Sequence, residues 1–409
     1  MTEFGWTDAG IALGALFGLF AGLAGAVLSL TWLERKTLAR IQQRAGPSVV
    51  GPHGLLQPLA DMVKLVTKED VIPAAADRAL FWAAPLVVAV PAFLLWIVIP
   101  FANDFGVRSL ELGLLFLIAV SGIGTVGLLM AGWTAASKYS MLGGFRAAAH
   151  LVSYEIPIIF VVLSVAVLVQ SLDLGHVISG HAVEVAGRTV ELPGQSAVPF
   201  AVIMPLGLIV FFLAGLAEIG RTPFDIHHAE SEVVGGPFVE YSGAHWAALF
   251  LAEYMNTFLV AALTVLLFFG GWSWPAPPES VFGADLPVAA TRTLGASWFL
   301  FKAYLVTFAI FWIRGTYPRL RIDQLMAFGW QTLIPLSFVN LILVAAVVYY
   351  GWPMWAMSLL SLPFIGLLWA IVGRRTRQAR GAVTVKLYRK AVLATGGHGG
   401  PAVRDALVN

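Results

Sequence analysis

The sequence predicts an all-α polytopic membrane protein with about nine transmembrane helices, and two observations support this fold class. Of the 409 residues, 59% are hydrophobic and only 12% are charged, and the mean hydropathy is +0.83. So few charges do not cover the surface of a soluble protein of 43.9 kDa. The charges also lie between long uncharged stretches, and one helix needs about 20 apolar residues to cross a bilayer. The composition therefore excludes a soluble globular protein.

The expected transmembrane segments follow in order along the chain. The first seven are Ala9–Leu33, Ala79–Asn103, Leu112–Ser137, Ala147–Leu172, about Val198–Ala217, Tyr241–Gly271 and Thr293–Ile313. The eighth and ninth share the uncharged run from Gln324 to Gly373, which is long enough for two helices and which Pro353 interrupts. Three of the segments contain one charged residue each, namely Glu155, Glu253 and Lys302.

The distribution of basic residues predicts the orientation of these helices. Of the 25 Lys and Arg residues, 21 lie in alternate loops and in the C-terminal tail, whereas Arg108, Arg188 and Arg292 lie on the other side. Basic loops stay in the cytoplasm, so the N-terminus is expected outside and the C-terminus inside. Eight helices would place the basic tail on the wrong side. We therefore expect a membrane domain at 1–373 and a basic cytoplasmic tail at 374–409.

Two loops have a periodicity of their own. In the first inner loop, 34–78, the run Gly54–Lys68 predicts an amphipathic helix lying on the membrane. Its apolar positions are Leu55, Leu59, Met62, Val63 and Val66, and its polar positions are Gln57, Asp61, Lys64 and Lys68. Such a helix either seals the bilayer surface or forms the rim of a pocket for an amphiphilic ligand. In the outer loop, the alternation that follows His181 predicts a small β-hairpin.

The inner loop 218–240 is acidic, although inner loops are usually basic. Its single basic residue is Arg221, and its acidic residues are Glu218, Asp225, Glu230, Glu232 and Glu240. Glu155 and Glu253 each lie roughly 12–13 Å into the membrane from the inner face, at 1.5 Å per residue. Ionising a carboxylate at that depth is unfavourable, so it can hold or release a proton near neutrality. Such a row of carboxylates indicates a proton relay, and the alternative is that basic partners or helix packing lock each acid in place.

Composition and spacing also limit other classes of function. The absence of Cys excludes disulfides, thiolate nucleophiles and Cys-ligated zinc or iron–sulfur clusters. A net charge of +2 offers no electrostatic footprint for a nucleic acid. A haem-bearing anchor would need facing imidazoles, and only His150 and His245 lie near the ends of expected helices. An autonomous cation/proton antiporter using Glu155 and Glu253 is a further alternative, although no inverted repeat is visible.

Four stretches of the chain closely resemble one protein family. They are Glu34-Arg35-Lys36 with RIQQRAGPSVVGPHGLLQPLADMVKLVTKED, KYSMLGGFRAAAHLVSYEIP, AEIGRTPFDIHHAESEVVGGPFVEYSGAHWAALFLAEYMN and WIRGTYPRLRIDQLM. These motifs are similar to those of the H subunit of proton-translocating NADH:quinone oxidoreductase, which is respiratory complex I. The likeness covers roughly residues 9–373 and leaves only the tail uncovered.

This resemblance implies a multi-pass subunit of the cell (inner) membrane that carries no redox centre, metal or catalytic residue of its own. It would form the membrane floor of a chamber for the substrate quinone, ubiquinone or menaquinone. Its implied partners are peripheral-arm subunits with flavin and iron–sulfur clusters, and antiporter-like membrane subunits. The family's chamber positions match Arg35, Lys36, Arg44, Asp61, Lys64, Arg221 and Phe224. Its acidic path matches Glu155, Glu218, Asp225, Glu230, Glu232, Glu240 and Glu253.

The resemblance leaves the electron donor open, and the sequence departs from the family at four positions. A related complex supplied by reduced deazaflavin, ferredoxin or a hydrogenase module would contain an equivalent chain, because the donor binds elsewhere. The family commonly has Glu at His228, Gln at His150, Asn at Ser48 and Tyr at Ile322. Because the first departure removes a carboxylate from the acidic loop, no proton role is assigned to His228.

Overall fold

The computed structural model describes residues 6–185, 188–192, 194–195, 198–226, 234–273 and 287–370. The chain forms two compact units, Met1–Ser358 and Leu359–Asn409. The cavities and ion pairs described below all belong to the first unit. The expected basic tail, 374–409, lies outside the described residues.

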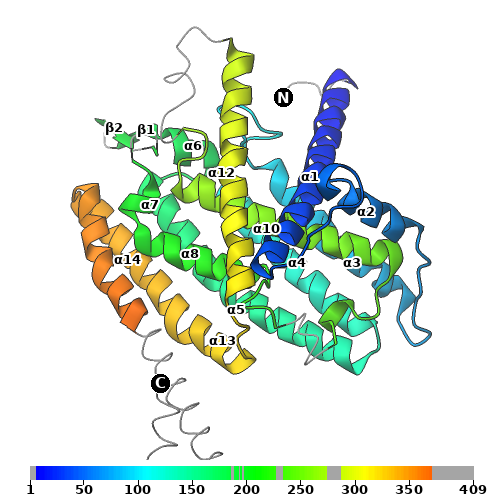
Figure 1. Ribbon diagram of the computed structural model, residues 1–409. Coiled ribbons are helices and arrows are strands. Elements are labelled where there is room, and N and C mark those ends of the chain that lie inside the picture. Colours follow the sequence, from blue (N-terminus) through cyan, green and yellow to red (C-terminus); the bar gives the residue numbers. More distant parts are fainter. Residues whose placement is uncertain are drawn as a thin grey trace, which may run out of the picture. The chain divides into compact units, whose positions relative to one another are not determined.

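Helices make up almost all regular structure in the described part of the chain, which confirms the predicted fold class (Figure 1). Seven helices are long and apolar enough to cross a membrane. Six are single elements: α1 (Trp6–Ile41), α3 (Arg78–Ile97), α4 (Gly113–Thr134), α5 (Lys138–Val169), α10 (Gly243–Phe268) and α12 (Val288–Thr316). The seventh runs through α13 (Ile322–Phe328), the π-helical turn η3 (Gly329–Leu333) and α14 (Ile334–Tyr350).

Two shorter apolar helices stand where the fifth and ninth transmembrane segments are expected. They are α8, Pro205–Glu218, and the helix Met354–Ala370. The segment expected at about Val198–Ala217 is divided into α7 (Phe200–Ile203) and α8, because Met204 leaves the helical conformation and Pro205 starts a new helix. With 14 residues, α8 is about 21 Å long. In the described residues, seven helices are therefore long enough to cross a membrane, and the two shorter helices leave the expected count of nine unconfirmed.

Both loops have the secondary structure predicted for them. The amphipathic helix is α2 (Gln57–Thr67), and it is shorter than expected because a 3₁₀ turn, η1 (Pro52–Gly54), precedes it. The apolar side chains of Leu55, Leu59 and Val63 are exposed, as expected of a helix that lies on a membrane. In the other loop, the short helix α6 (Leu174–Ser179) leads into strand β1 (His181–Val185), which pairs antiparallel with β2 (Arg188–Leu192).

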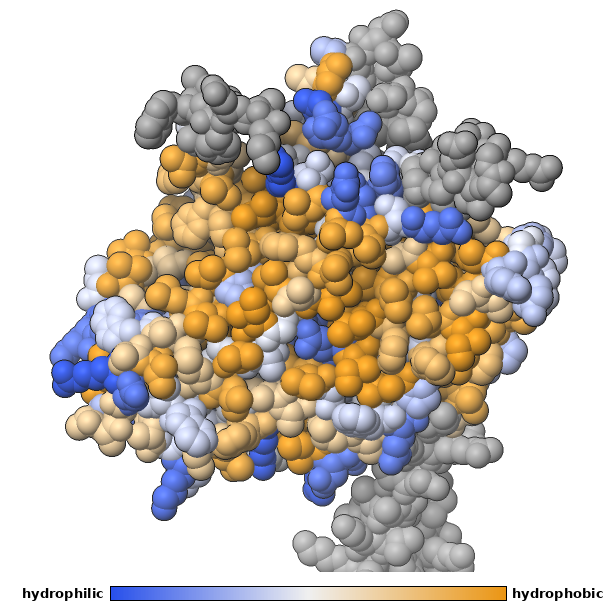
Figure 2. Space-filling view, turned by 180° about the vertical axis from the view of Figure 1, so that it is seen from behind, coloured by the Kyte–Doolittle hydropathy of each residue, from blue (hydrophilic) through white to orange (hydrophobic). Residues whose placement is uncertain are grey.

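Helix α10 is the most buried of the long helices and packs against α1, α2, α3, α8 and α12. Figure 1 shows it running through the middle of these elements. Aromatic rings fix these contacts, as where Phe258 of α10 stacks on Trp96 of α3 with ring centroids 5.1 Å apart. The outside is different, because hydrophobic residues form a broad band across the face seen in Figure 2. Most side chains of α10 therefore face neighbouring helices.

Candidate functional site

A buried cluster of charges joins four parts of the chain at the end of the bundle where α1 and α12 end. Glu34 of α1 has a side chain that is only 4% exposed. Its carboxylate accepts a hydrogen bond of 2.7 Å from the hydroxyl of Tyr254 and forms ion pairs with Arg221 and Arg314. Two cations and a hydroxyl thus compensate the cost of burying this carboxylate.

Arg221 bridges the two acids of this cluster. It follows the C-terminus of α8, and its guanidinium lies 3.6 Å from the Glu34 carboxylate and 3.4 Å from that of Glu253 on α10. The ring of Tyr254 lies beneath it, 4.5 Å from the guanidinium carbon. Burial lowers the pKa of Arg221, but Glu253 and Tyr254 more than offset this and raise the pKa above its ordinary value. Arg221 is therefore a fixed positive charge between two carboxylates.

A cavity of about 520 Å³ opens beside this cluster, and we call it the Arg221 cavity. Its lining includes Glu34 and Arg35 of α1, Trp246 and Glu253 of α10, and Asp225 of the acidic loop. A second cavity, the α2 cavity, has a volume of about 360 Å³ and lies between α1, α2 and the start of α10. The two cavities share Arg35, Trp246 and Phe250 and therefore adjoin each other.

An ion pair links α1 to the amphipathic helix at this shared wall. Arg35 donates to Asp61 over 2.5 Å, Gln57 donates to the same carboxylate over 3.3 Å, and Lys64 lies 4.0 Å from it. Partial burial raises the pKa of Asp61, but the hydrogen bonds and the charges of Arg35 and Lys64 outweigh burial and leave the pKa below its usual value. Asp61 is therefore ionised near neutrality and holds Arg35 toward α2.

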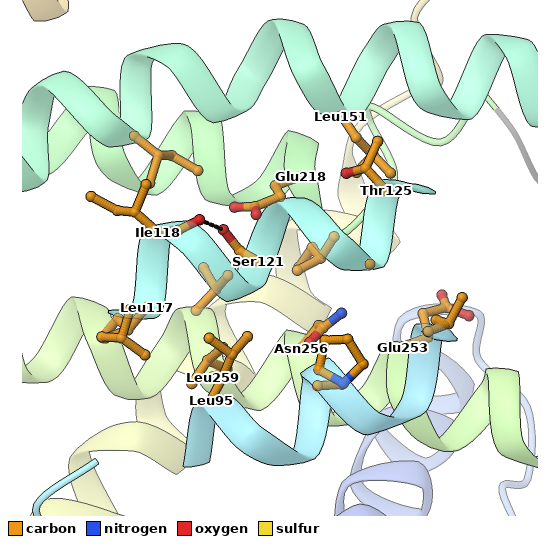
Figure 3. A pocket seen from close by; sticks show the side chains of 18 of the residues that line it. Leu95, Leu117, Ile118, Ser121, Thr125, Leu151, Glu218, Glu253, Asn256 and Leu259 are labelled. Atoms are coloured by element: carbon orange, nitrogen blue, oxygen red, sulfur yellow. Dashed lines mark hydrogen bonds between the residues drawn. The ribbon is translucent and has the colours of Figure 1, made fainter. Parts of the chain in front are cut away.

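A third cavity lies inside the bundle, between α3, α4, α5 and α10, and we call it the interior cavity. It has a volume of about 120 Å³ and is mostly apolar, with Glu218, Glu253 and Asn256 among its polar linings. Figure 3 shows Glu218 from α8 beside Ser121 of α4, with Glu253 on the far side of the same space. Because Glu253 also lines the Arg221 cavity, this residue borders both spaces.

Other residues of the predicted acidic path lie near these cavities. Glu155 accepts a hydrogen bond of 3.1 Å from Ser121, which itself lines the interior cavity. Asp225 lines the Arg221 cavity and forms an ion pair of 2.7 Å with Arg319. Glu240 is half-buried at the end of the acidic loop. Glu230, Glu232 and His228 lie outside the described residues.

The predicted chamber residues fall into two groups. The first group is Arg35, Asp61, Lys64 and Arg221, which line the α2 and Arg221 cavities. Phe224 is buried, its backbone N–H donates to the carbonyl of Arg221 over 2.9 Å, and its ring contacts those of Tyr154 and Phe328. Lys36 and Arg44 form the second group, because they line a separate groove on another side of α1.

Sequence reasoning missed part of the charged cluster. Glu34, Tyr254 and Arg314 all lie inside the quoted motifs, yet no periodicity separates them from neighbouring polar residues. Of the two histidines near helix ends, His245 is paired with Asp70 at 2.6 Å, and His150 packs on the ring of Tyr154. Lys302 donates to the backbone carbonyl of Phe269 over 2.9 Å, near the end of α10.

Comparisons with known proteins identify the family. Residues 14–345 match the family model described as NADH dehydrogenase. The chain is 43% identical over 349 residues to the NADH-quinone oxidoreductase H subunit of Geobacillus kaustophilus, covering 84% of this chain and 96% of that protein. It is 40% identical over 345 residues to the H subunit of the same enzyme from Dehalococcoides mccartyi, covering 84% and 88%. The chain therefore belongs to the NADH dehydrogenase family that includes the H subunit of NADH-quinone oxidoreductase.

Proposed function

We propose that this chain forms the quinone-binding chamber and the start of the proton path in a membrane-bound NADH:quinone oxidoreductase. The names of its relatives support NADH as the electron source and quinone as the substrate of the complex. The chain has no cysteine to ligate an iron–sulfur cluster. In this proposal, flavin and iron–sulfur clusters of partner subunits deliver the electrons, and this chain holds the quinone and moves protons.

The two adjoining cavities suit a ligand that has an apolar tail and a polar head. The α2 cavity presents Val27 and Leu28 of α1 and Met62 of α2 to a tail arriving from the bilayer. The Arg221 cavity presents charged groups to a head group. Trp246 and Phe250 stand where the cavities meet and offer aromatic faces to the ring.

The observation that carries the proposal is the position of Glu253 between the Arg221 cavity and the interior cavity. Reducing a quinone to a quinol consumes two electrons and two protons, and in this proposal groups lining the Arg221 cavity supply the protons. The quinol is neutral, and the groups that gave up protons are each more negative by one charge. A change in charge there alters how strongly Arg221 attracts Glu253, and hence how readily Glu253 takes up a proton. Glu218 across the interior cavity, and Glu155 beside Ser121, then continue the path into the membrane. Asp225, Glu230, Glu232 and Glu240 form its part in the acidic loop.

The proposal includes a topology and a set of partners. Nine helices cross the cell (inner) membrane, the two short apolar helices among them, with the N-terminus outside and the tail 374–409 in the cytoplasm. The loops 34–78 and 218–240 then face the peripheral-arm subunits. Antiporter-like membrane subunits receive the coupling from the far end of the acidic path. The unequal distribution of Lys and Arg between alternate loops supports this orientation.

Photolabelling tests the chamber directly. A photoreactive quinone analogue is added to membranes that contain the tagged, assembled complex, and the labelled peptides of this chain are mapped. We expect labels on α1, α2 and α10 around Arg35, Trp246 and Phe250, and we expect excess natural quinone to suppress them. Labelling that excess quinone does not suppress, or that is confined to other helices, would contradict the chamber.

A further inference from the structure

A groove of about 1010 Å³ lies on a different side of α1 from the α2 cavity and the Arg221 cavity, and we call it the Lys36 groove. Its basic linings are Lys36, Arg40 and Arg44 of the α1 end and His53 of η1. Trp32 of α1 and Trp312 of α12 also line it. It shares no lining residue with the α2 cavity or with the Arg221 cavity.

The positive charge of this groove is not neutralised within the described part of the chain. No acidic residue is among its linings. Arg44 donates to the side-chain oxygen of Gln42 over 2.7 Å, which leaves its charge uncompensated. In the described residues, no ion pair involves Lys36, Arg40 or Arg44. The groove therefore attracts an anion.

Packing fixes the walls of the groove. Helices α1 and α12 lie against each other (Figure 1), and the hydroxyls of Ser29 and Tyr304 are 2.6 Å apart across this contact. Near the groove, Gly315 lets the helices approach closely, because a Cβ atom there would lie 2.6 Å from Ile41. The indole of Trp32 donates to the carbonyl of His53 over 3.2 Å and holds η1 in place. A ligand would thus meet a preformed site.

We propose that the Lys36 groove binds the head group of an anionic phospholipid from the surrounding bilayer. Basic pockets between transmembrane helices on the cytoplasmic side are suited to phosphate head groups, and the guanidinium groups of Arg40 and Arg44 can bind phosphate oxygens in pairs. Tryptophan is typical of the head-group level, where Trp312 is 53% exposed. The exposed side chains of Phe301 and Leu305, further along α12, offer an apolar surface to the acyl chains. A neutral quinone gains nothing from this unneutralised charge.

Photolabelling with lipids tests this site. The full chain with its natural partners is reconstituted into nanodiscs that contain photoreactive phosphatidylglycerol or photoreactive phosphatidylcholine, and label on peptides within 32–55 and 301–312 is quantified. We expect stronger labelling by phosphatidylglycerol. Arg40→Gln should lower it about fivefold and Arg40→Glu further, because each basic residue near an anionic surface contributes about 1 kcal/mol. The matched control is Arg78→Gln, which changes an exposed arginine at the start of α3, outside the groove, and should leave labelling unchanged.

Three outcomes would overturn the proposal. Equal labelling by the two lipids would show that the groove does not select an anionic head group. Unchanged labelling in Arg40→Glu would show that its charge is not used. Cross-linking of the groove to a partner subunit in the wild-type complex, with no lipid label, would show that a protein covers it. Because the readout is lipid label and not quinone turnover, failure here is distinguishable from failure of the proposed quinone chamber.

Discussion

The C-terminal end of α1 borders the Arg221 cavity on one side and the Lys36 groove on the other. The charged residues on these two sides differ in burial and in ion pairing. On the side of the Arg221 cavity, the side chains of Glu34 and Arg221 are 4% and 6% exposed, and both are ion-paired. On the side of the Lys36 groove, the basic residues are more exposed and have no acidic partner in the described residues. A charge inside a protein must be compensated there, whereas water and lipid head groups can compensate a charge at the surface. The comparison teaches that charges on the buried side are compensated within the chain, whereas those on the side of the Lys36 groove are left for the surroundings to compensate.

Arg221→Gln should have the largest effect, because it tests whether the buried charges depend on one another. Without the guanidinium, Glu253 loses its ion pair with Arg221, and Glu34 keeps Arg314 and Tyr254 among the described residues. Removing one member of a buried ion pair destabilises a protein by about 3–5 kcal/mol. We expect a clear fall in the apparent Tm of the purified complex and loss of quinone reduction in membranes.

Arg221→Lys serves as the control for that prediction. It retains a positive charge but loses the planar group that reaches Glu34, Glu253 and the Tyr254 ring together. We expect it to recover part of the apparent Tm. An Arg221→Gln complex as stable and as active as wild type would remove the distinction between the two sides of α1.

Glu253→Gln tests whether the buried charged cluster around Arg221 transfers protons or has only a structural role. Glutamine has nearly the same size and retains an oxygen that can accept from Arg221, so the complex should assemble. It cannot carry a proton from the Arg221 cavity to the interior cavity. We expect coupled quinone reduction to fall about tenfold or more, which corresponds to 1.4 kcal/mol or more in the barrier, measured with proton pumping in membrane vesicles. Glu111→Gln, at an exposed site, is the matched control, and normal pumping by Glu253→Gln would exclude Glu253 from the path.

Asp61→Asn tests the partly exposed ion pair between Arg35 of α1 and Asp61 of α2. The Arg35 side chain is 44% exposed and that of Asp61 is 24% exposed, and ion pairs of this kind contribute at most about 1 kcal/mol to stability. We expect assembly to be nearly unchanged and quinone reduction to fall roughly two- to fivefold, as Arg35 is released from α2. Equal losses of assembled complex and of activity would instead indicate a structural role.

The pH dependence of this variant has a defined sign. The pKa of Asp61 lies below its ordinary value of 3.8. A lowered pKa gives a contribution that is present above that value and is lost only as the pH falls through the pKa of the folded protein. Asp61 is thus ionised throughout pH 5–8. The ratio of wild-type to Asp61→Asn activity should therefore stay constant over that range, and a ratio that changes would contradict this account.

Much of the fold could be predicted from local sequence signals. Uncharged runs located the long helices, and alternation in the outer loop located the β-hairpin, because both signals depend on a few neighbouring residues. The α8 region was less predictable. Hydropathy reads Val198–Ala217 as one apolar segment, but the backbone at Met204 and Pro205 divides it into two helices. Hydropathy averages over a window and does not detect such a break.

The site could be predicted only in part, because its contacts join distant positions. Carboxylates at an unusual depth drew attention to Glu155 and Glu253, and the resemblance supplied Arg35, Asp61 and Arg221. The pairing of Glu34 with Arg314 could not be derived, since it depends on α1 and α12 packing together. The separation of Lys36 from Arg35 likewise depends on which neighbours each side of α1 meets.

Lys36→Gln should have the smallest effect on stability, and it tests the exposed side of the comparison. Lys36 lies two positions after Glu34 on the same helix, but no ion pair involves it in the described residues. The substitution therefore leaves no buried charge without its partner. Changes at such sites usually alter stability by no more than about 0.5 kcal/mol. We expect an unchanged apparent Tm in detergent without anionic lipid, measured beside Glu34→Gln, which removes the buried anion next to Arg221 and Arg314 and should lower it. A large fall in Lys36→Gln would mean that Lys36 has a buried role, and the two sides of α1 would then differ less than their exposure indicates.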